Sequence, residues 1–243
     1  MVQEQRLLDG VSENLANAQS AGFKRVQPLR QGFASILAER GRTGDIAGTG
    51  GAGITRDGVY RDFSTGEQQN TGNPFDVALN GEGVFYRVRD ESGRLLLTRN
   101  ARFTTDERQR LVTVEGWAVE GQGGPVTLPT GSQSVNVDSS GRITAEVDGG
   151  FQFVDQLRVS RVAEADLPRL QAVSGQYFEP GVVELPDAVD YQIQQGFLEG
   201  ANVQPVEELV RMVGLQRRYD AAQRAMTRQL GMQGFSDVLR GVS

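Results

Sequence analysis

The chain has 243 residues, 38% of them hydrophobic, and a formal net charge of −6 at pH 7. It contains neither cysteine nor histidine, which excludes disulfides, catalytic arrangements built on Cys-His or Ser-His-Asp, and most kinds of zinc site. The acidic balance argues against general binding of nucleic acid or of anionic membranes.

The sequence predicts neither a membrane-spanning segment nor a secretory leader. No run of 18 apolar residues occurs, so we expect no insertion into a membrane. The first residues, MVQEQRLLDGVSENLANA, lack the basic region and apolar stretch of a secretory signal. If the protein leaves the cytoplasm, it needs a route that does not cleave such a signal.

Residues 1–40 form the first predicted domain, an assembly helix followed by a turn. Apolar residues recur there at steps of three and four, which is typical of an amphipathic helix. They are Leu8, Val11, Leu15 and Ala18. Gly22 suits a left-handed stop at the helix end, and Phe23 can fold back onto the apolar face.

Residues 41–74 are predicted to be a Gly-rich linker or extended hairpin region. Gly48, Gly50 and Gly53 match the G-x-G-x-x-G pattern of dinucleotide sites. Such a site needs an apolar strand before the glycines and a helix after them, whereas the flanks here are Gly, Thr and Arg. A flexible connection therefore explains these glycines better than nucleotide binding does.

Residues 75–185 alternate short β-like segments with turns, which predicts a central all-β domain of barrel or sandwich type. Asn80-Gly81 and Ser92-Gly93 are turn dipeptides, and Asp138–Gly141 predicts another turn. The expected strands are Phe75–Leu79, Val84–Val88, Leu95–Arg99, Leu111–Val114, Trp117–Val119, Val126–Leu128, Val135–Val137, Ile143–Val147 and Gln156–Val162.

Residues 186–243 are predicted to return through an extended segment, Tyr191–Leu198, and to end in a second assembly helix. Pro205 suits the first turn of that helix, and Glu207 and Glu208 suit the positive end of its dipole. Its stripe at helical spacing is Leu209, Val213, Gln216, Tyr219, Ala222, Met226 and Leu230.

The two ends thus carry helices around a β middle, an α+β organisation. An apolar stripe at each end favours pairing of the N- and C-terminal helices as a coiled coil or helical assembly domain. The second helix also has a basic face of Arg211, Arg217, Arg218, Arg224 and Arg228. Such a face could bind phosphate, but the acidic net charge favours a solvated or subunit-bridging role.

Carboxylates are plentiful in the β-rich part, but no spacing picks out the pair that a glycosidase needs. We therefore expect a chain built to polymerise rather than an enzyme, with no catalytic, cofactor or metal site.

Motifs at both ends and in the middle of the chain resemble the flagellar rod and hook protein family. Asn14-Leu15-Ala16-Asn17 and Gly22-Phe23-Lys24 stand where that family has "NNLANxxTxGFK". Leu198-Glu199-Gly200, Asn202-Val203, Glu207-Glu208 and Gln216-Arg217 match its "LEGSNVxxxEEMVxMIxxQRxYE". Asp76–Gly83 and Thr98-Arg99-Asn100 resemble its "DVAIxGxGFF" and "TRxGxF". Departures include Glu13, Ala101 and Ala201, where the family has Asn, Gly and Ser.

The resemblance implies a structural subunit of the bacterial flagellar basal-body rod, the drive shaft that transmits torque across the periplasm. Such subunits are exported by the flagellar type III apparatus without a cleaved signal peptide. They polymerise helically with themselves and other rod subunits, and they meet hook and ring proteins. Hook proteins of the family are generally longer, so the chain length favours a rod subunit. Gly123–Pro129, which resembles "GGPIxIP", favours the proximal rod type over the distal type. A hook or hook-junction component of the same family is the alternative, and a cell-wall glycosidase is a more remote one.

The expected assembly interface combines helix residues with residues of the adjoining turns. Its members are Leu8, Val11, Leu15, Asn17, Gly22, Phe23, Gly200, Asn202, Leu209, Val213, Tyr219 and Met226. Amphipathic ends that cannot bury their stripes alone are expected to become ordered on assembly. Limited proteolysis of the monomer is therefore expected to leave a core of roughly residues 60–185.

Overall fold

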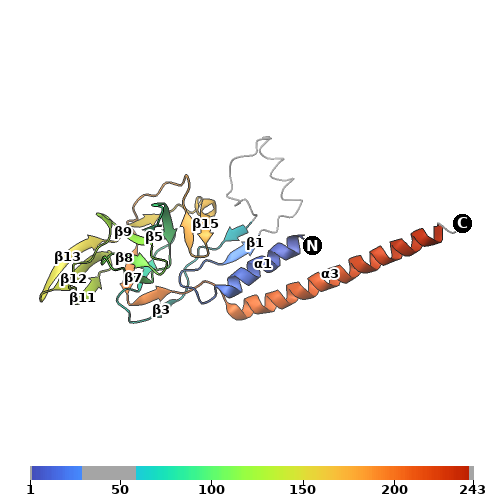
Figure 1. Cartoon of the computed structure of the whole chain (residues 1–243), viewed down its shortest axis with the longest axis horizontal. Helices are drawn as coiled ribbons and strands as arrows, with labels where there is room; N and C mark the ends of the chain where they lie inside the picture. Colours follow the sequence, from blue (N-terminus) through green and yellow to red (C-terminus); the bar gives the residue numbers. More distant parts are fainter. Residues whose placement is uncertain (1, 29–58, 241–243) are drawn as a thin grey trace.

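The computed structural model describes residues 2–28 and 59–240 of the chain. The expected linker with Gly48, Gly50 and Gly53 lies largely outside these residues. The molecule is elongated, with a β-rich module at one end and a long helix that projects from it (Figure 1). The predicted α+β class is confirmed.

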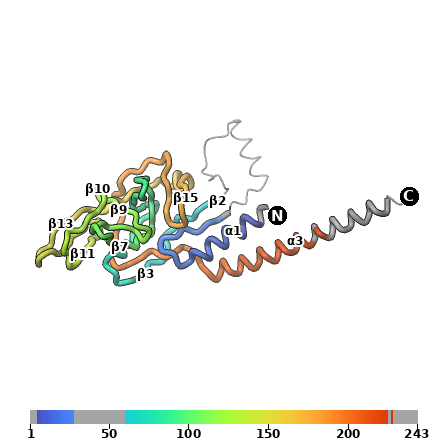
Figure 2. Tube along the Cα trace, viewed as in Figure 1, coloured from blue at the N-terminus to red at the C-terminus, as the bar shows by residue number. Residues whose placement is uncertain are grey.

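Two helices represent the two ends of the chain. The first, α1, spans Val2–Ala16, and the second, α3, spans Pro205–Arg240 and continues beyond the predicted stripe. The two helices contact each other, with α1 lying beside the first part of α3 (Figures 1 and 2). Their packing supports the expected pairing of the termini, whereas coiled-coil geometry stays a prediction.

The largest sheet contains nine strands. Its main path runs β15-β16-β6-β5-β9-β8-β7, with β10 paired to β9 and β14 paired to β5, and all of its pairs are antiparallel. The strands are β5 (Val84–Arg89), β6 (Leu95–Thr98), β7 (Phe103–Thr105), β8 (Leu111–Thr113), β9 (Ala118–Gly121), β10 (Gly124–Pro125), β14 (Val159–Arg161), β15 (Gln171–Ser174) and β16 (Tyr177–Glu179). A short 3-10 helix, η1 (Leu167–Arg169), precedes β15.

Three smaller sheets complete the β structure of the described residues. The first has the strand order β11 (Ser134–Val137), β12 (Arg142–Val147), β13 (Gly150–Gln156). The second has the order β17 (Gln192–Gln195), β4 (Val77–Asn80), β18 (Phe197–Glu199), β3 (Gln68–Asn70). The third pairs β1 (Val26–Pro28) with β2 (Val59–Arg61). The sheet around β4 therefore draws strands from three of the predicted sequence ranges: 41–74, 75–185 and 186–243.

The main core lies inside the β module, where the central strand β5 is buried over most of its length. Side chains from β4, β5, β9 and β12 join one apolar cluster, among them Leu79, Tyr86, Val119 and Ile143. The core therefore packs together strands that belong to different hydrogen-bonded sheets.

Most predicted strands are present, with shifted ends, but Val126–Leu128 is not a strand. Val126 and Leu128 are buried in the core, whereas Thr127 makes only an isolated bridge to Arg110. The apolar alternation that suggested a strand here reflects the burial of Val126 and Leu128, whose backbone groups make single hydrogen bonds to Val119, Leu111 and Gln109 without forming a continuous strand ladder.

Candidate functional site

The chain segments that leave α1 and enter α3 meet the β module at one place, which we call the junction. It is formed by residues 22–26, 62–66, 99–100 and 199–202. In Figure 2 the path from α1 into β1 passes beside the path from β18 into α3. The junction therefore determines how both terminal helices are attached to the β module.

A buried cluster of three charged side chains lies at the centre of the junction. One carboxylate oxygen of Glu199 accepts from Lys24 Nζ at 2.7 Å, and the other accepts from Arg99 Nε at 2.7 Å. The exposed fractions of the Lys24 and Glu199 side chains are 1% and 0%. Further bonds run from Lys24 Nζ to the Ser64 carbonyl at 2.6 Å and from the Gly66 amide to Glu199 at 2.9 Å. The cluster thereby joins four distant parts of the chain.

The electrostatics follow from one anion facing two cations. Burial would raise the pKa of Glu199, but Arg99 and Lys24 together hold it below its usual range. Burial lowers the pKa of Lys24, the attraction of Glu199 opposes that shift, and the charge of Arg99 reinforces it. Glu199 is therefore the group on which both ion pairs depend.

Gly22 permits a close approach between the N-terminal segment and the β module. Its φ is +69°, and its amide donates to the Glu199 carbonyl at 2.8 Å. A Cβ at this position would lie 2.5 Å from the carbonyl carbon of Arg99, closer than real atoms pack. The prediction that Gly22 ends the first helix is wrong, because α1 already ends at Ala16.

Asn202 holds the beginning of the C-terminal segment in the junction through its side-chain amide. Its Oδ1 accepts from the Arg25 amide at 2.7 Å, and its Nδ2 donates to the Asp62 carbonyl at 2.8 Å and to the Ser64 carbonyl at 3.1 Å. Asn202 thus bridges the residue before β1 and the segment after β2, neither of which adjoins Asn202 in sequence.

Asn14 plays the corresponding part on the N-terminal side. Its side chain is buried and pairs with both backbone groups of Val26: Nδ2 donates to the carbonyl at 2.8 Å, and Oδ1 accepts from the amide at 2.7 Å. Asn17 bonds only locally, from Nδ2 to the Glu13 carbonyl at 2.9 Å. The Asn-Leu-Ala-Asn motif therefore fastens α1 to β1.

An ion pair links the first turn of α3 to Arg25, the residue before β1. Arg25 Nη2 lies 2.6 Å from Glu208 Oε1, and Arg211 approaches the same oxygen at 2.9 Å. Among the described residues, Arg25 Nε and Glu208 Oε2 are buried side-chain atoms without a hydrogen-bond partner. A single carboxylate oxygen therefore serves both arginines here.

The helix α3 has two different faces. Glu208 and Leu215 are buried and Met212, Tyr219 and Ala222 are half-buried, at steps of three and four. The opposite face carries Val206, Leu209, Val210 and Val213, with exposed fractions of 74%, 51%, 68% and 41%. We call these four residues the exposed patch. An apolar patch exposed along a helix is a typical protein-contact surface.

The expected interface residues divide between the inside and the outside of the subunit. Val11, Gly22 and Phe23 are buried, and Phe23 packs with Val26 and Val203. Half-buried residues are Leu8, Leu15, Asn17, Gly200, Asn202 and Tyr219, whereas Leu209 and Val213 are exposed. The Met226 side chain lies outside the described residues. The buried members thus hold the subunit itself together, and a contact between subunits through the others stays a prediction.

Sequence reasoning assigned no role to Lys24, Arg99 or Glu199, although each lies within a quoted motif. A signal was present: Lys24 follows Phe23, and Glu199 follows Phe197 and Leu198 in a short apolar strand. Charges in such settings are expected to be buried and paired. Their partners could not be identified, because they lie far apart in sequence.

Within residues 2–28 and 59–240, no helix is both long and apolar enough to cross a membrane. In the same residues, no three Asp or Glu side chains are grouped so that they could hold a metal ion.

Two family models match parts of the chain. Residues 194–236 match "Flagellar basal body rod FlgEFG protein C-terminal", which covers β18, the end of the junction and most of α3. Residues 78–145 match "Flagellar hook protein FlgE/F/G D1 domain", which covers much of the β module.

Relatives with known names match nearly the whole length. The flagellar basal-body rod protein FlgF of Caulobacter vibrioides is 34% identical over 91% of this chain and 86% of its own. FlgF of Salmonella typhimurium is 29% identical over 96% of this chain and 91% of its own. The rod protein FlgG of Agrobacterium fabrum is 28% identical over 92% of this chain and 90% of its own.

Proposed function

Because the chain belongs to the family of flagellar basal-body rod proteins, we propose that it polymerises helically through its terminal helices to build the rod. It is a structural rod subunit, and the proximal rod type fits its relatives. We propose further that it transmits torque across the periplasm and meets hook and ring proteins. In this proposal it is exported by the type III apparatus without a cleaved signal peptide and catalyses no reaction.

The observation that carries this proposal is the exposed patch on α3. The helix already satisfies one face against α1, so the patch is left over after the subunit has folded. Fully burying a Val or Leu side chain contributes about 1.5–3 kcal/mol, and four of them in a row offset part of the cost of association. A second subunit is the natural cover for such a surface in a protein that forms a polymer.

The test replaces Val213, the last residue of the patch, by Asp. In the monomer this side chain is partly solvated, so the free energy of unfolding should change by about 0.5 kcal/mol or less. In a packed interface an unpaired charge costs several kcal/mol, so polymerisation and motility should be lost. Thermal unfolding of the monomer and sedimentation of assembled protein measure the two effects separately.

Gln223→Asp is the matched control, because it adds the same charge at an exposed position of α3 beyond the patch. It should leave both stability and assembly intact. Normal motility with Val213→Asp would show that the patch is not an assembly surface. A clear loss of monomer stability would show that Val213 belongs to the subunit's own core.

A further inference from the structure

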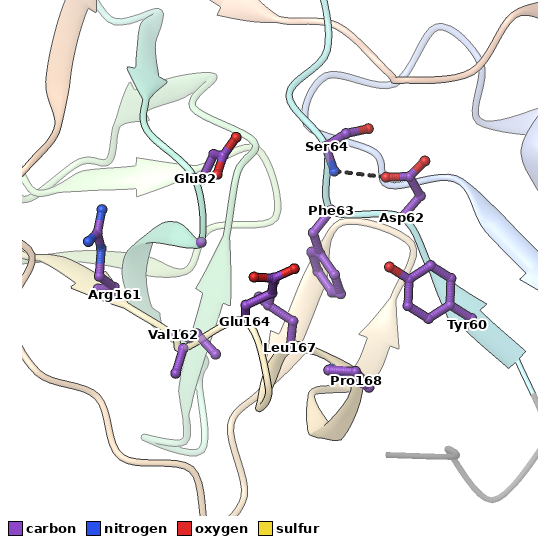
Figure 3. A pocket seen from close by; sticks show the side chains of 12 residues that line it. Tyr60, Asp62, Phe63, Ser64, Glu82, Arg161, Val162, Glu164, Leu167 and Pro168 are labelled. Atoms are coloured by element: carbon purple, nitrogen blue, oxygen red, sulfur yellow. Dashed lines mark hydrogen bonds between the residues drawn. The ribbon is translucent and has the colours of Figure 1, made fainter. Parts of the chain in front are cut away.

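A cavity of about 440 Å³ lies on the β module, beside the junction. Its walls come from the segment after β2, the turn between β4 and β5, and the chain between β14 and η1 (Figure 3). It therefore brings together three segments that are distant in sequence, as a binding site does.

The apolar part of the cavity is firmly held. Phe63 packs edge-on against Phe85 and Phe178, with ring centroids 5.8 and 5.2 Å apart. Leu167, a second lining residue, packs against the same cluster. Because Phe63 and Leu167 pack against a buried apolar cluster, the cavity is already formed in the single subunit, and a ligand does not have to open it.

The rim of the cavity is acidic. Figure 3 shows the carboxylates of Asp62, Glu82 and Glu164 around the ring of Phe63, with Arg161 as the one basic lining residue. Asp62 accepts from the Ser64 amide at 2.9 Å. Glu82 and Glu164 make no ion pair or side-chain hydrogen bond with any residue in the described part of the chain. The guest that fits is a cation with an apolar stem, which is the chemistry of an arginine side chain on an aromatic floor.

A helical polymer supplies such a guest. Its contacts are heterologous, so a surface on one copy meets a different surface on the next. The exposed patch on α3 continues at helical steps from Val206 through Val210 and Val213 to Arg217, which is exposed and has no ion-pair partner among the described residues. One helix face thus presents valines followed by an arginine, which complements an apolar cavity with an acidic rim.

We propose that this cavity is the acceptor for α3 of a second copy of the chain, with Arg217 inserted between Phe63 and the carboxylates of Glu82 and Glu164. The inference rests on the proposed polymerisation and specifies its acceptor surface. Ser64, which lines the cavity, also belongs to the junction, because its carbonyl accepts hydrogen bonds from Lys24 and Asn202. A neighbour's side chain in the cavity would therefore press directly on the segment that anchors both terminal helices.

Disulfide trapping tests the contact directly, because the chain has no cysteine of its own. Full-length Glu164→Cys is mixed with full-length Arg217→Cys and oxidised under assembly conditions. Cross-linked dimer should form roughly tenfold faster than with Arg108→Cys, an exposed arginine on a distant turn, because docking raises the local concentration of the paired thiols. Equal rates for the two mixtures would overturn the proposal.

Charge exchange gives an independent readout. Glu164→Arg and Arg217→Glu should each weaken self-association roughly tenfold, and the chain carrying both changes should recover most of the loss. Additive losses in the double variant would contradict the pairing. A different outcome is that the monomer's thermal midpoint falls in each single variant and recovers in the double variant. That result would mean that Arg217 pairs with Glu164 of its own chain, and it would also overturn the proposal.

Val213→Asp separates this inference from the proposed function. If Val213→Asp abolishes association while the cavity variants associate normally, the acceptor is wrong and polymerisation through α3 stands. If Val213→Asp has no effect, the proposed function fails, and the disulfide experiment still decides whether Arg217 reaches the cavity.

Discussion

At the scale of single residues, Glu199 ties both ends of the chain to the β module. Its carboxylate faces Lys24 from the segment after α1 and Arg99 from the loop after β6. Because two buried cations share one anion, removing the anion is worse than removing either cation. The cluster thus makes the attachment of the helices depend on a single side chain.

Glu199→Gln should destabilise the monomer by about 3–5 kcal/mol, since it leaves two buried cations without a counter-ion. Lys24→Met should cost less, because Glu199 then keeps Arg99 and the Gly66 amide. Urea unfolding measures both changes, with Glu107→Gln in an exposed turn as a control expected near zero. Equal losses for Glu199→Gln and Lys24→Met would contradict the shared-anion account.

At the scale of elements, three turns of the β module follow one pattern. In each, an aspartate Oδ1 accepts from the amides two and four positions later, and an arginine ends the turn. These turns begin at Asp90, Asp106 and Asp138. The third residue after each aspartate has positive φ: Gly93 at 82°, Gln109 at 59° and Gly141 at 85°. The turns with glycine were predicted, whereas the turn with Gln109 gives no such signal in the sequence.

Gly22 and Gly93 share positive φ but differ in surroundings, so one substitution at each separates two effects. Gly93→Ala should cost roughly 1–2 kcal/mol for the backbone conformation alone, because nothing lies near its added Cβ. Gly22→Ala should cost clearly more, because the same methyl group meets the backbone of Arg99 and Asn100. Thermal unfolding of the two variants gives the comparison. Similar losses would mean that the junction moves apart easily.

At the scale of the whole molecule, the structure moves the boundary between a stable core and the projecting helix. β17 and β18 lie beyond residue 185, yet they pair with β4 inside the β module. The junction then extends the buried part to Asn202 and Val203. The C-terminal limit of the cooperative unit is therefore expected after β18 rather than before β17.

Brief trypsin digestion of the monomer should cut first at exposed arginines of α3, such as Arg217, Arg218 and Arg224. The long-lived fragment should end at Arg211 or a later arginine of α3, instead of at Arg169, the preceding trypsin site, because β17 and β18 are paired in a sheet. Mass spectrometry of the fragments gives the limits. Loss of β17 and β18 before α3 would contradict this assignment, as would equal resistance along the chain.

The sequence by itself determined the α+β class, most strands, the two amphipathic ends and the family, because these depend on local periodicity and on motifs contiguous along the chain. Only the tertiary structure decided which distant side chains meet. No feature of the local sequence relates Lys24 to Glu199, or Phe63 to Glu164. It also decided which face of α3 remains free. Leu209 and Leu215 are equally apolar in the sequence, yet the folded chain buries Leu215 and leaves about half of Leu209 exposed to solvent.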